Sequence, residues 1–181
     1  LEVSRVPPID LGRRLEYLLA YPHGCVEQTV SAAFPQLFLG KLLELTPEKQ
    51  ARVETNVKAA LERLRRFQAA DGGFGYWPGD DDSADWATNY AGHFAVEAQK
   101  AGYLPPPGLL DQWTAFQRRR ARAWVPGEGQ PLPLPPGQAL ALQPGQALAL
   151  QPGQAELTQA YRLFTLALAG TPELPAMNQL R

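Results

Sequence analysis

The chain has 181 residues, 17 of them basic and 18 acidic, so its formal net charge is −1. This length suits a single domain with a buried core, and the balanced charge argues against a general nucleic-acid or membrane-surface role. The single cysteine excludes an internal disulfide, and no apolar run is long enough to cross a bilayer. The chain starts at Leu1 without a signal-peptide pattern, so we expect it to be a piece of a longer protein.

Residues 9–21 predict the first helix. Its leucines recur at helical spacing, Asp10 is the expected N-cap, and Pro22 should end the helix. The residues that follow Pro22 should therefore form a loop.

That loop carries the most specific chemical signal in the chain, the run Gly24-Cys25-Val26-Glu27-Gln28. On a helical turn this spacing puts Cys25 and Gln28 on one face, so the sulfur can reach the carboxamide carbon. Cysteine followed by Glu-Gln in this way is the signature of an internal thioester, in which the sulfur displaces ammonia and leaves an electrophilic acyl group. Gly24 should leave room for the close approach of another backbone.

A lone cysteine is more often a small buried hydrophobe, and this remains the ordinary alternative for Cys25. His23 precedes Cys25 by two residues and is the better placed of the two histidines to influence the thiol. His93 falls within a predicted helix, where a structural or surface role is expected.

The next two helices follow from apolar periodicity. Residues 30–45 keep a period of about 3.6 and predict a largely buried helix that Pro35 kinks or starts. Thr46 and Pro47 then predict a helix start as N-cap and first helical residue. This helix should stop at the run 71–73 (Asp-Gly-Gly). Its expected buried face is Val53, Val57, Ala60, Leu61, Leu64 and Phe67, opposite Lys58, Glu62, Arg65 and Arg66.

Further helices are predicted on both sides of a proline-rich break. Asp82 or Ser83 should cap a helix that runs to about Gly102. The run 105–108 (Pro-Pro-Pro-Gly) should break the chain, and another helix should extend from Leu109 to about Trp124.

Residues 125–154 are of low complexity. The octapeptide Pro-Gly-Gln-Ala-Leu-Ala-Leu-Gln occupies 136–143 and again 144–151, and a third copy starts at 152. Such a repeat is too short for a helical solenoid unit and lacks the period of collagen. We therefore expect a Pro/Gly-rich loop inserted between helices. A helix should resume over about 155–169, and another should start near Pro172.

Two charged clusters have ordinary explanations. The acidic run 80–85 resembles a calcium loop, but Asp85 and Ala91 stand where an EF-hand needs glycine and glutamate, so capping and a solvated turn are expected. A second cluster interleaves with aromatic residues and is better explained by a solvated helix face than by nucleic-acid binding. Its members are Arg118, Arg119, Arg120 and Arg122.

The run Leu18–Thr29 resembles, almost residue for residue, the thioester region of bacterial alpha-2-macroglobulins, large periplasmic relatives of the animal protease-trapping and complement thioester proteins. A second resemblance to this family covers Gln68–Trp77 and Asp85–Ala91. Both lie within roughly the first half of the chain.

This resemblance implies an all-α fold that forms part of an α/α toroid of helical hairpins. Residues 1–181 would be the N-terminal portion of a single thioester domain, with residues 125–154 as a loop within it. The protein would be a periplasmic endopeptidase inhibitor that acts once and is not an enzyme. No cofactor, metal ion, nucleic acid or direct membrane contact is expected.

The resemblance also assigns roles at the site. Cys25 and Gln28 would form the thioester, and Glu27 belongs to the same motif. Cleavage of a bait elsewhere in the full protein, which supplies other domains, would expose the acyl group to a lysine amine of the target protease. A downstream histidine redirects the acyl group to hydroxyls in complement-type relatives, but His93 lies in a different segment, so amines are the expected acceptors.

The electrophile survives only where water is excluded. The local aromatic residues that could shield it are Tyr21, Tyr76, Trp77, Trp86 and Tyr90. Without the rest of the domain and its partners the bond should hydrolyse, so we expect no bond between Cys25 and Gln28 in this chain alone.

Two alternatives remain from the sequence. One is an enzyme on the same toroid, such as a prenyltransferase or terpene cyclase, because Gln68–Trp77 also resembles glycine-aromatic turns of those families. Against it, one cysteine and two distant histidines supply no closed zinc set, and Ser83 replaces the last acid of an Asp-x-Asp-Asp motif. The other alternative is a helical binding module with an inert Cys25.

Overall fold

The computed structural model describes residues 18–126 and 154–180. Within these ranges the chain is helical and contains no strand, only an isolated antiparallel bridge between Gln68 and Phe74. The helix predicted over 9–21 lies almost wholly outside the described residues. Leu18 is helical and Leu19 lies in a turn, so the chain leaves this helix before Pro22. No described helix is long and apolar enough to cross a membrane.

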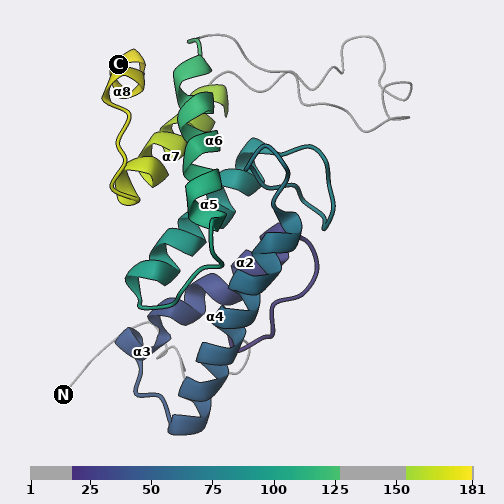
Figure 1. Cartoon of the computed structure of the whole chain (residues 1–181). Helices are drawn as coiled ribbons and strands as arrows, with labels where there is room; N and C mark the ends of the chain where they lie inside the picture. Colours follow the sequence, from purple (N-terminus) through teal and green to yellow (C-terminus); the bar gives the residue numbers. More distant parts are fainter. Residues whose placement is uncertain (1–17, 127–153, 181) are drawn as a thin grey trace, which may run out of the picture.

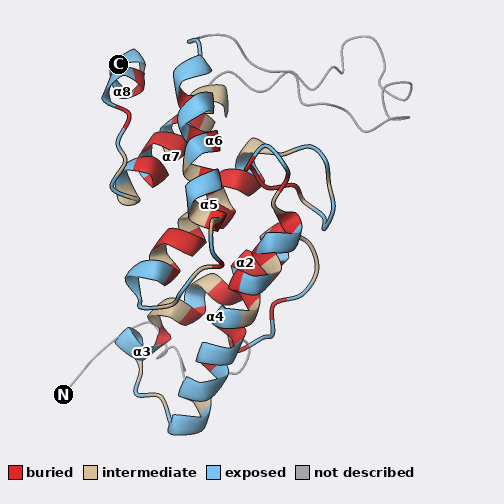
Figure 2. Cartoon of the chain, in the orientation of Figure 1, coloured by how far each residue is buried: buried red, intermediate tan, exposed pale blue. Residues whose placement is uncertain are grey.

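The helices form two packed rows (Figure 1). Helices α2, α5 and α7 lie side by side, α4 and α6 pack against them, and α8 contacts α6 and α7. The bounds are α2 Val26–Ala33, the 3-10 helix η1 Phe34–Phe38, α3 Leu39–Leu42, α4 Pro47–Phe67, α5 Asp85–Lys100, α6 Leu109–Ala123, α7 Gln154–Leu168 and α8 Leu174–Gln179. The buried residues line the contacts between the helices (Figure 2).

The single helix predicted over 30–45 is wrong. Pro35 lies at the start of η1, and the α-helical hydrogen bonding of α2 ends just before it because proline has no N–H to donate. The short helix α3 then ends at Leu42, whose side chain is 71% exposed. The segment is therefore broken into three short helical pieces and is only partly buried.

Helix α4 starts as predicted and ends earlier. The Thr46 hydroxyl accepts the backbone N–H of Lys49 at 3.4 Å, and the predicted apolar face is buried, which confirms the N-cap and the stripe. The helix ends at Phe67, however, where Gln68 becomes extended. Gly72 is left-handed, with φ of 93°, but in the turn after the helix.

The cap predicted for α5 is also wrong. The N-cap residue is Ala84, which offers no side-chain cap. The Ser83 hydroxyl instead donates to the Asp71 carboxylate at 2.8 Å, and the Ala84 N–H donates to the Phe74 carbonyl at 2.9 Å. The start of α5 is thus fixed by the preceding loop and not by its own sequence. The other helix limits, at residues 100, 123, 154, 168 and 174, differ from the predictions by one or two residues.

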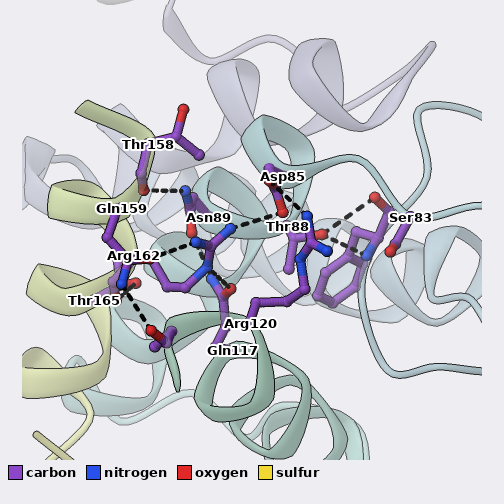
Figure 3. Close-up of polar contacts among 12 residues, drawn as sticks. Ser83, Asp85, Thr88, Asn89, Gln117, Arg120, Thr158, Gln159, Arg162 and Thr165 are labelled. Atoms are coloured by element: carbon purple, nitrogen blue, oxygen red, sulfur yellow. Dashed lines mark hydrogen bonds and ion pairs between the residues drawn. The ribbon is translucent and has the colours of Figure 1, made fainter. Parts of the chain in front are cut away.

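A buried polar network joins α5, α6 and α7 (Figure 3). Arg162 of α7, with a side chain 3% exposed, pairs with Asp85 at 2.7 Å. It also donates to the side-chain oxygens of Gln117 at 3.0 Å and Gln159 at 2.6 Å. Gln117 in turn donates to Asn89 at 2.5 Å. These side chains fix the mutual positions of three helices from inside.

The arginines of α6 lie largely on an exposed face, as expected, but they also pair with acidic residues of neighbouring segments. Arg118 and Arg122 both bind the buried carboxylate of Glu173, just before α8. The hydrogen bond from Arg122, together with the other arginine, holds the pKa of Glu173 below its ordinary value. Arg120 pairs with Asp85 at 3.2 Å. These cations therefore stabilise contacts between helices.

Candidate functional site

The two residues of the candidate thioester meet at the start of α2. Cys25 is the N-cap, and Gln28 is the third residue of the helix. The Gln28 side chain folds back so that its Oε1 accepts the backbone N–H of Cys25 at 3.1 Å. The Cys25 side chain faces the backbone N–H of Gln28 in the reciprocal arrangement of a capping box. The carboxamide thus lies beside the residue whose sulfur would attack it.

Gly24 makes this arrangement sterically possible. Its φ is 77°, a left-handed conformation that side chains disfavour. A Cβ placed on Gly24 would lie 1.9 Å from Oε1 and 2.9 Å from Cδ of Gln28. The group that approaches Gly24 closely is therefore the glutamine side chain, and not a second backbone as the sequence suggested.

Three long-range or medium-range contacts hold the loop before α2. The Thr29 hydroxyl donates to the His23 carbonyl at 3.3 Å, and the Arg63 Nη2 donates to the Gly24 carbonyl at 3.0 Å. The Val26 N–H donates to the Tyr76 carbonyl at 3.0 Å. The last bond links the two segments on which the family resemblance rests.

Sequence reasoning missed Arg63. This residue lies on α4 three residues after Ala60 and four before Phe67, both of which are buried. A cation with this spacing borders the apolar stripe and cannot lie on the fully solvated face. That position was the only signal for it in the sequence.

Among the candidate shielding residues, Tyr76 interacts most directly with the pair. It is half-buried, and burial raises the pKa of its hydroxyl, with smaller contributions from the nearby Glu27 and Cys25. Glu27 is itself half-buried. The structure thus places this tyrosine near Cys25 and Glu27.

The other candidate rings are more open to solvent. Tyr21 is 48% exposed, with its ring centroid 5.0 Å from that of His23, and Trp77 is 57% exposed. Trp86 stacks on Tyr90 along α5 at 5.9 Å, and the Tyr90 hydroxyl is 3.2 Å from the hydroxyl of Ser31 on α2. Cys25 is half-buried and Gln28 is exposed, so the described residues do not enclose the pair.

The structure does not bring His93 to the pair. Its ring packs edge-on against Phe34, which follows the C-terminal end of α2, whereas Cys25 precedes the N-terminal end. The His93 Nδ1 lies 3.0 Å from the Tyr161 hydroxyl. Burial lowers the pKa of His93 and raises that of Tyr161 to about 12. These contacts place His93 in an aromatic cluster, as expected for a structural role.

No group of three or more His, Cys, Asp or Glu side chains within 18–126 and 154–180 is arranged to hold a metal ion. In the acidic run, the Asp80 carboxylate accepts the Trp77 N–H at 2.8 Å, and Asp85 pairs with arginines. The run therefore serves turn formation and helix pairing.

The chain is similar to known proteins in sequence. Residues 6–117 match the A-macroglobulin TED domain family. The alpha-2-macroglobulin of Escherichia coli (strain K12) is 32% identical over 116 residues, which are 62% of this chain and 7% of that protein. The alpha-2-macroglobulin of Thermotoga maritima is 30% identical over 111 residues, or 61% of this chain and 7% of that protein.

Solved structures are similar over most of the chain. Salmonella alpha-2-macroglobulin reacted with methylamine has a TM-score of 0.70 and 25% identity, covering 97% of this chain and 11% of that one. Trypsin-activated alpha-2-macroglobulin from Escherichia coli has a TM-score of 0.68 and 25% identity, covering 89% of this chain and 10% of that one.

The fold and the match define a thioester domain of the α/α toroid type, which confirms the predicted fold class. The chain belongs to the A-macroglobulin TED domain family, and its relatives are bacterial alpha-2-macroglobulins. These findings do not favour the toroid enzyme. The chain spans 7% of the length of the relatives named above.

Proposed function

We propose that this chain forms the N-terminal portion of the thioester domain of a protease-trapping alpha-2-macroglobulin. The loop expected over 125–154 is proposed as an insertion within it, except that Gln154 belongs to α7 and residues 127–153 lie outside the described residues. The observation that carries the proposal is the Gln28 carboxamide folded onto the backbone of Cys25 in the space that Gly24 leaves free. The Escherichia coli relative in its trypsin-activated form supports proteases as the targets.

The chemistry has two steps. The Cys25 sulfur attacks Cδ of Gln28, the C–N bond of the amide breaks, and ammonia leaves with the thiol proton. Later a lysine amine of a bound protease attacks the same carbon and displaces Cys25 as the thiol, which takes up a proton lost by the amine. The new amide is stable, so each domain reacts once and the protein is an inhibitor and not an enzyme.

Amines are the proposed acceptors because His93 packs against Phe34 and Tyr161, away from the pair, and the exposed His23 ring lies against Tyr21. Tyr76 is the proposed local shield. The exposed Tyr21 and Trp77, and the Trp86–Tyr90 stack, are proposed to complete the shield together with other domains of a longer, periplasmic protein.

The test is the intact mass of the longer protein that carries this domain. We expect it to be lighter than the encoded sequence by about 17 mass units, the ammonia lost on acyl transfer. Methylamine should add to the protein and release one thiol, whereas glycerol at the same concentration should release far less. Cys25→Ser is the control and should have the encoded mass. A freely reactive Cys25 in fresh, uncleaved protein would contradict the proposal.

A further inference from the structure

One peptide group at the site is hydrogen-bonded at both of its ends. The Gly24 carbonyl accepts the Arg63 guanidinium at 3.0 Å. The N–H of the same peptide unit belongs to Cys25 and donates to Oε1 of Gln28 at 3.1 Å. A cation, a backbone amide and the oxygen of the candidate acyl group therefore form one continuous chain of hydrogen bonds.

Within the described part of the chain, the Arg63 side chain makes few polar contacts besides this one. Its guanidinium lies over the Phe67 ring, 5.7 Å from the centroid, on the buried border of α4. Its Nε is buried and has no hydrogen-bond partner among the described residues. Leaving a donor unpaired costs free energy, so this placement is not that of an arginine that merely solvates the surface. The Gly24 carbonyl is the hydrogen-bond acceptor that the structure gives to this guanidinium.

Oε1 of Gln28 is the atom on which negative charge develops in acyl transfer. When a nucleophile adds to Cδ, the carbonyl oxygen becomes an oxyanion before the leaving group departs, and a donor already aimed at it lowers the barrier. The Cys25 N–H occupies that position. Resting on the thioester function proposed above, we propose that this N–H is an oxyanion donor and that Arg63 is the positioning residue that orients and polarises it.

The backbone of Gly24 alone would not fix the direction of the Cys25 N–H. Gly24 has wide conformational freedom, and its peptide could rotate the Cys25 N–H away from Oε1. The bond to Arg63 fixes the peptide plane. Hydrogen bonds in a chain also strengthen one another by about 10–30% each, so a cation on the carbonyl makes the N–H a better donor.

The same oxyanion occurs in both steps. In thioester formation the Cys25 sulfur adds to Cδ, the C=O electron pair moves to Oε1, and its return expels ammonia. In capture the amine nitrogen adds to Cδ, and the return of the electron pair expels the Cys25 sulfur, which becomes a thiol as the amine loses its proton. Arg63 should therefore influence how fast the bond forms and how fast it reacts.

The test compares Arg63→Gln with Arg66→Gln in the longer protein. Arg66 is on the same helix, carries the same charge and is exposed. The readout is the rate of thiol release by methylamine, normalised to the fraction of molecules that show the thioester mass. Removing a whole oxyanion donor costs about 10²–10³ in rate. Weakening one through Arg63→Gln should cost about tenfold, and Arg66→Gln should match the wild type.

The direction of the change in rate distinguishes a positioning role of Arg63 from a general effect on stability. A merely loosened site would admit amine and water more readily and react faster, so an equal or faster normalised rate in Arg63→Gln would overturn the inference. If Arg63→Gln does not fold, Arg63→Lys decides, because it keeps the charge and one donor and should give an intermediate rate. A wild-type protein without the mass deficit would instead refute the proposed function itself.

Discussion

At the scale of single residues, Gly24 shows how the site depends on one absent methyl group. Its left-handed backbone is one constraint, and the 1.9 Å that would separate a Cβ at this position from Oε1 of Gln28 is another. The first would destabilise any residue with a side chain at this position. The second applies only if the Gln28 carboxamide must stay where it is.

Gly24→Ala separates these two constraints. We expect it to displace the Gln28 carboxamide and to remove most of the thioester, measured as loss of the mass deficit in the longer protein. Gly170→Ala is a matched control, because Gly170 has φ of 76° and nothing within 4 Å of a Cβ. Both variants should pay a backbone cost of about 1–3 kcal/mol, but the control should keep its thioester. Equal thioester content in the two would contradict the steric argument.

The sequence predicted the local part of this site and not the distant part. The spacing of Cys25 and Gln28 is a property of one helical turn, and the structure places the two together. The bond from Arg63 to Gly24 spans 39 positions, and the approach of Gln28 to Gly24 depends on a side-chain rotamer. Neither follows from spacing along the chain. The first requires the packing of α4 against the loop, and the second requires the conformation of the Gln28 side chain.

The same division holds at the scale of elements. Thr46 and Pro47 predicted the start of α4 because a cap uses only neighbouring residues. The start of α5 was wrong because Ser83 bonds to Asp71 across the loop. Pro35 was known to disturb its helix, but the choice between a kink and a 3-10 turn depends on tertiary packing. Caps made by neighbouring residues were thus predictable from the sequence, and contacts across a loop were not.

The buried network between α5, α6 and α7 predicts that removing the charge of Arg162 lowers the stability of the fold substantially. Arg162→Leu should lower the free energy of unfolding by about 1–3 kcal/mol for each of the two buried glutamine oxygens that lose their donor, whereas Asp85 keeps its pairing with Arg120. Lys58→Leu is the control, since Lys58 pairs with Glu54 at 3.7 Å on the surface and should cost only about 0.3–0.5 kcal/mol. Denaturant unfolding measures both. A small effect at Arg162 would show that the interior tolerates its loss by repacking.

At the scale of the whole molecule, the row of α2, α5 and α7 leaves apolar side chains open. Leu157 and Phe164 on α7 are 69% and 51% exposed, and Trp86 on α5 is 49% exposed. Exposed apolar groups in such numbers indicate a surface that other parts of a protein cover. This agrees with our proposal that further helices and domains complete the structure around the thioester.

That exposure leads to a prediction for the chain by itself. Since Gln28 is exposed and Cys25 only half-buried, water should reach the acyl group. The purified 181-residue chain should therefore show no mass deficit of ammonia and should present a reactive thiol. The longer protein, purified in the same way, serves as the control. A deficit of about 17 mass units in the short chain would mean that Tyr76 and its neighbours suffice as a shield.

The direct contacts between α6 and α7 also bear on the repeated octapeptide. Gln159 donates to the Ala121 carbonyl at 3.0 Å, and Arg162 donates to Gln117 at 3.0 Å, so α6 and α7 are hydrogen-bonded directly to each other. The entropy of closing a flexible loop grows only with the logarithm of its length, so in the insertion that we propose one more octapeptide would cost about 0.2 kcal/mol. On that proposal, the number of copies can drift through replication slippage with almost no penalty to folding, and variation in that number would carry little information about function.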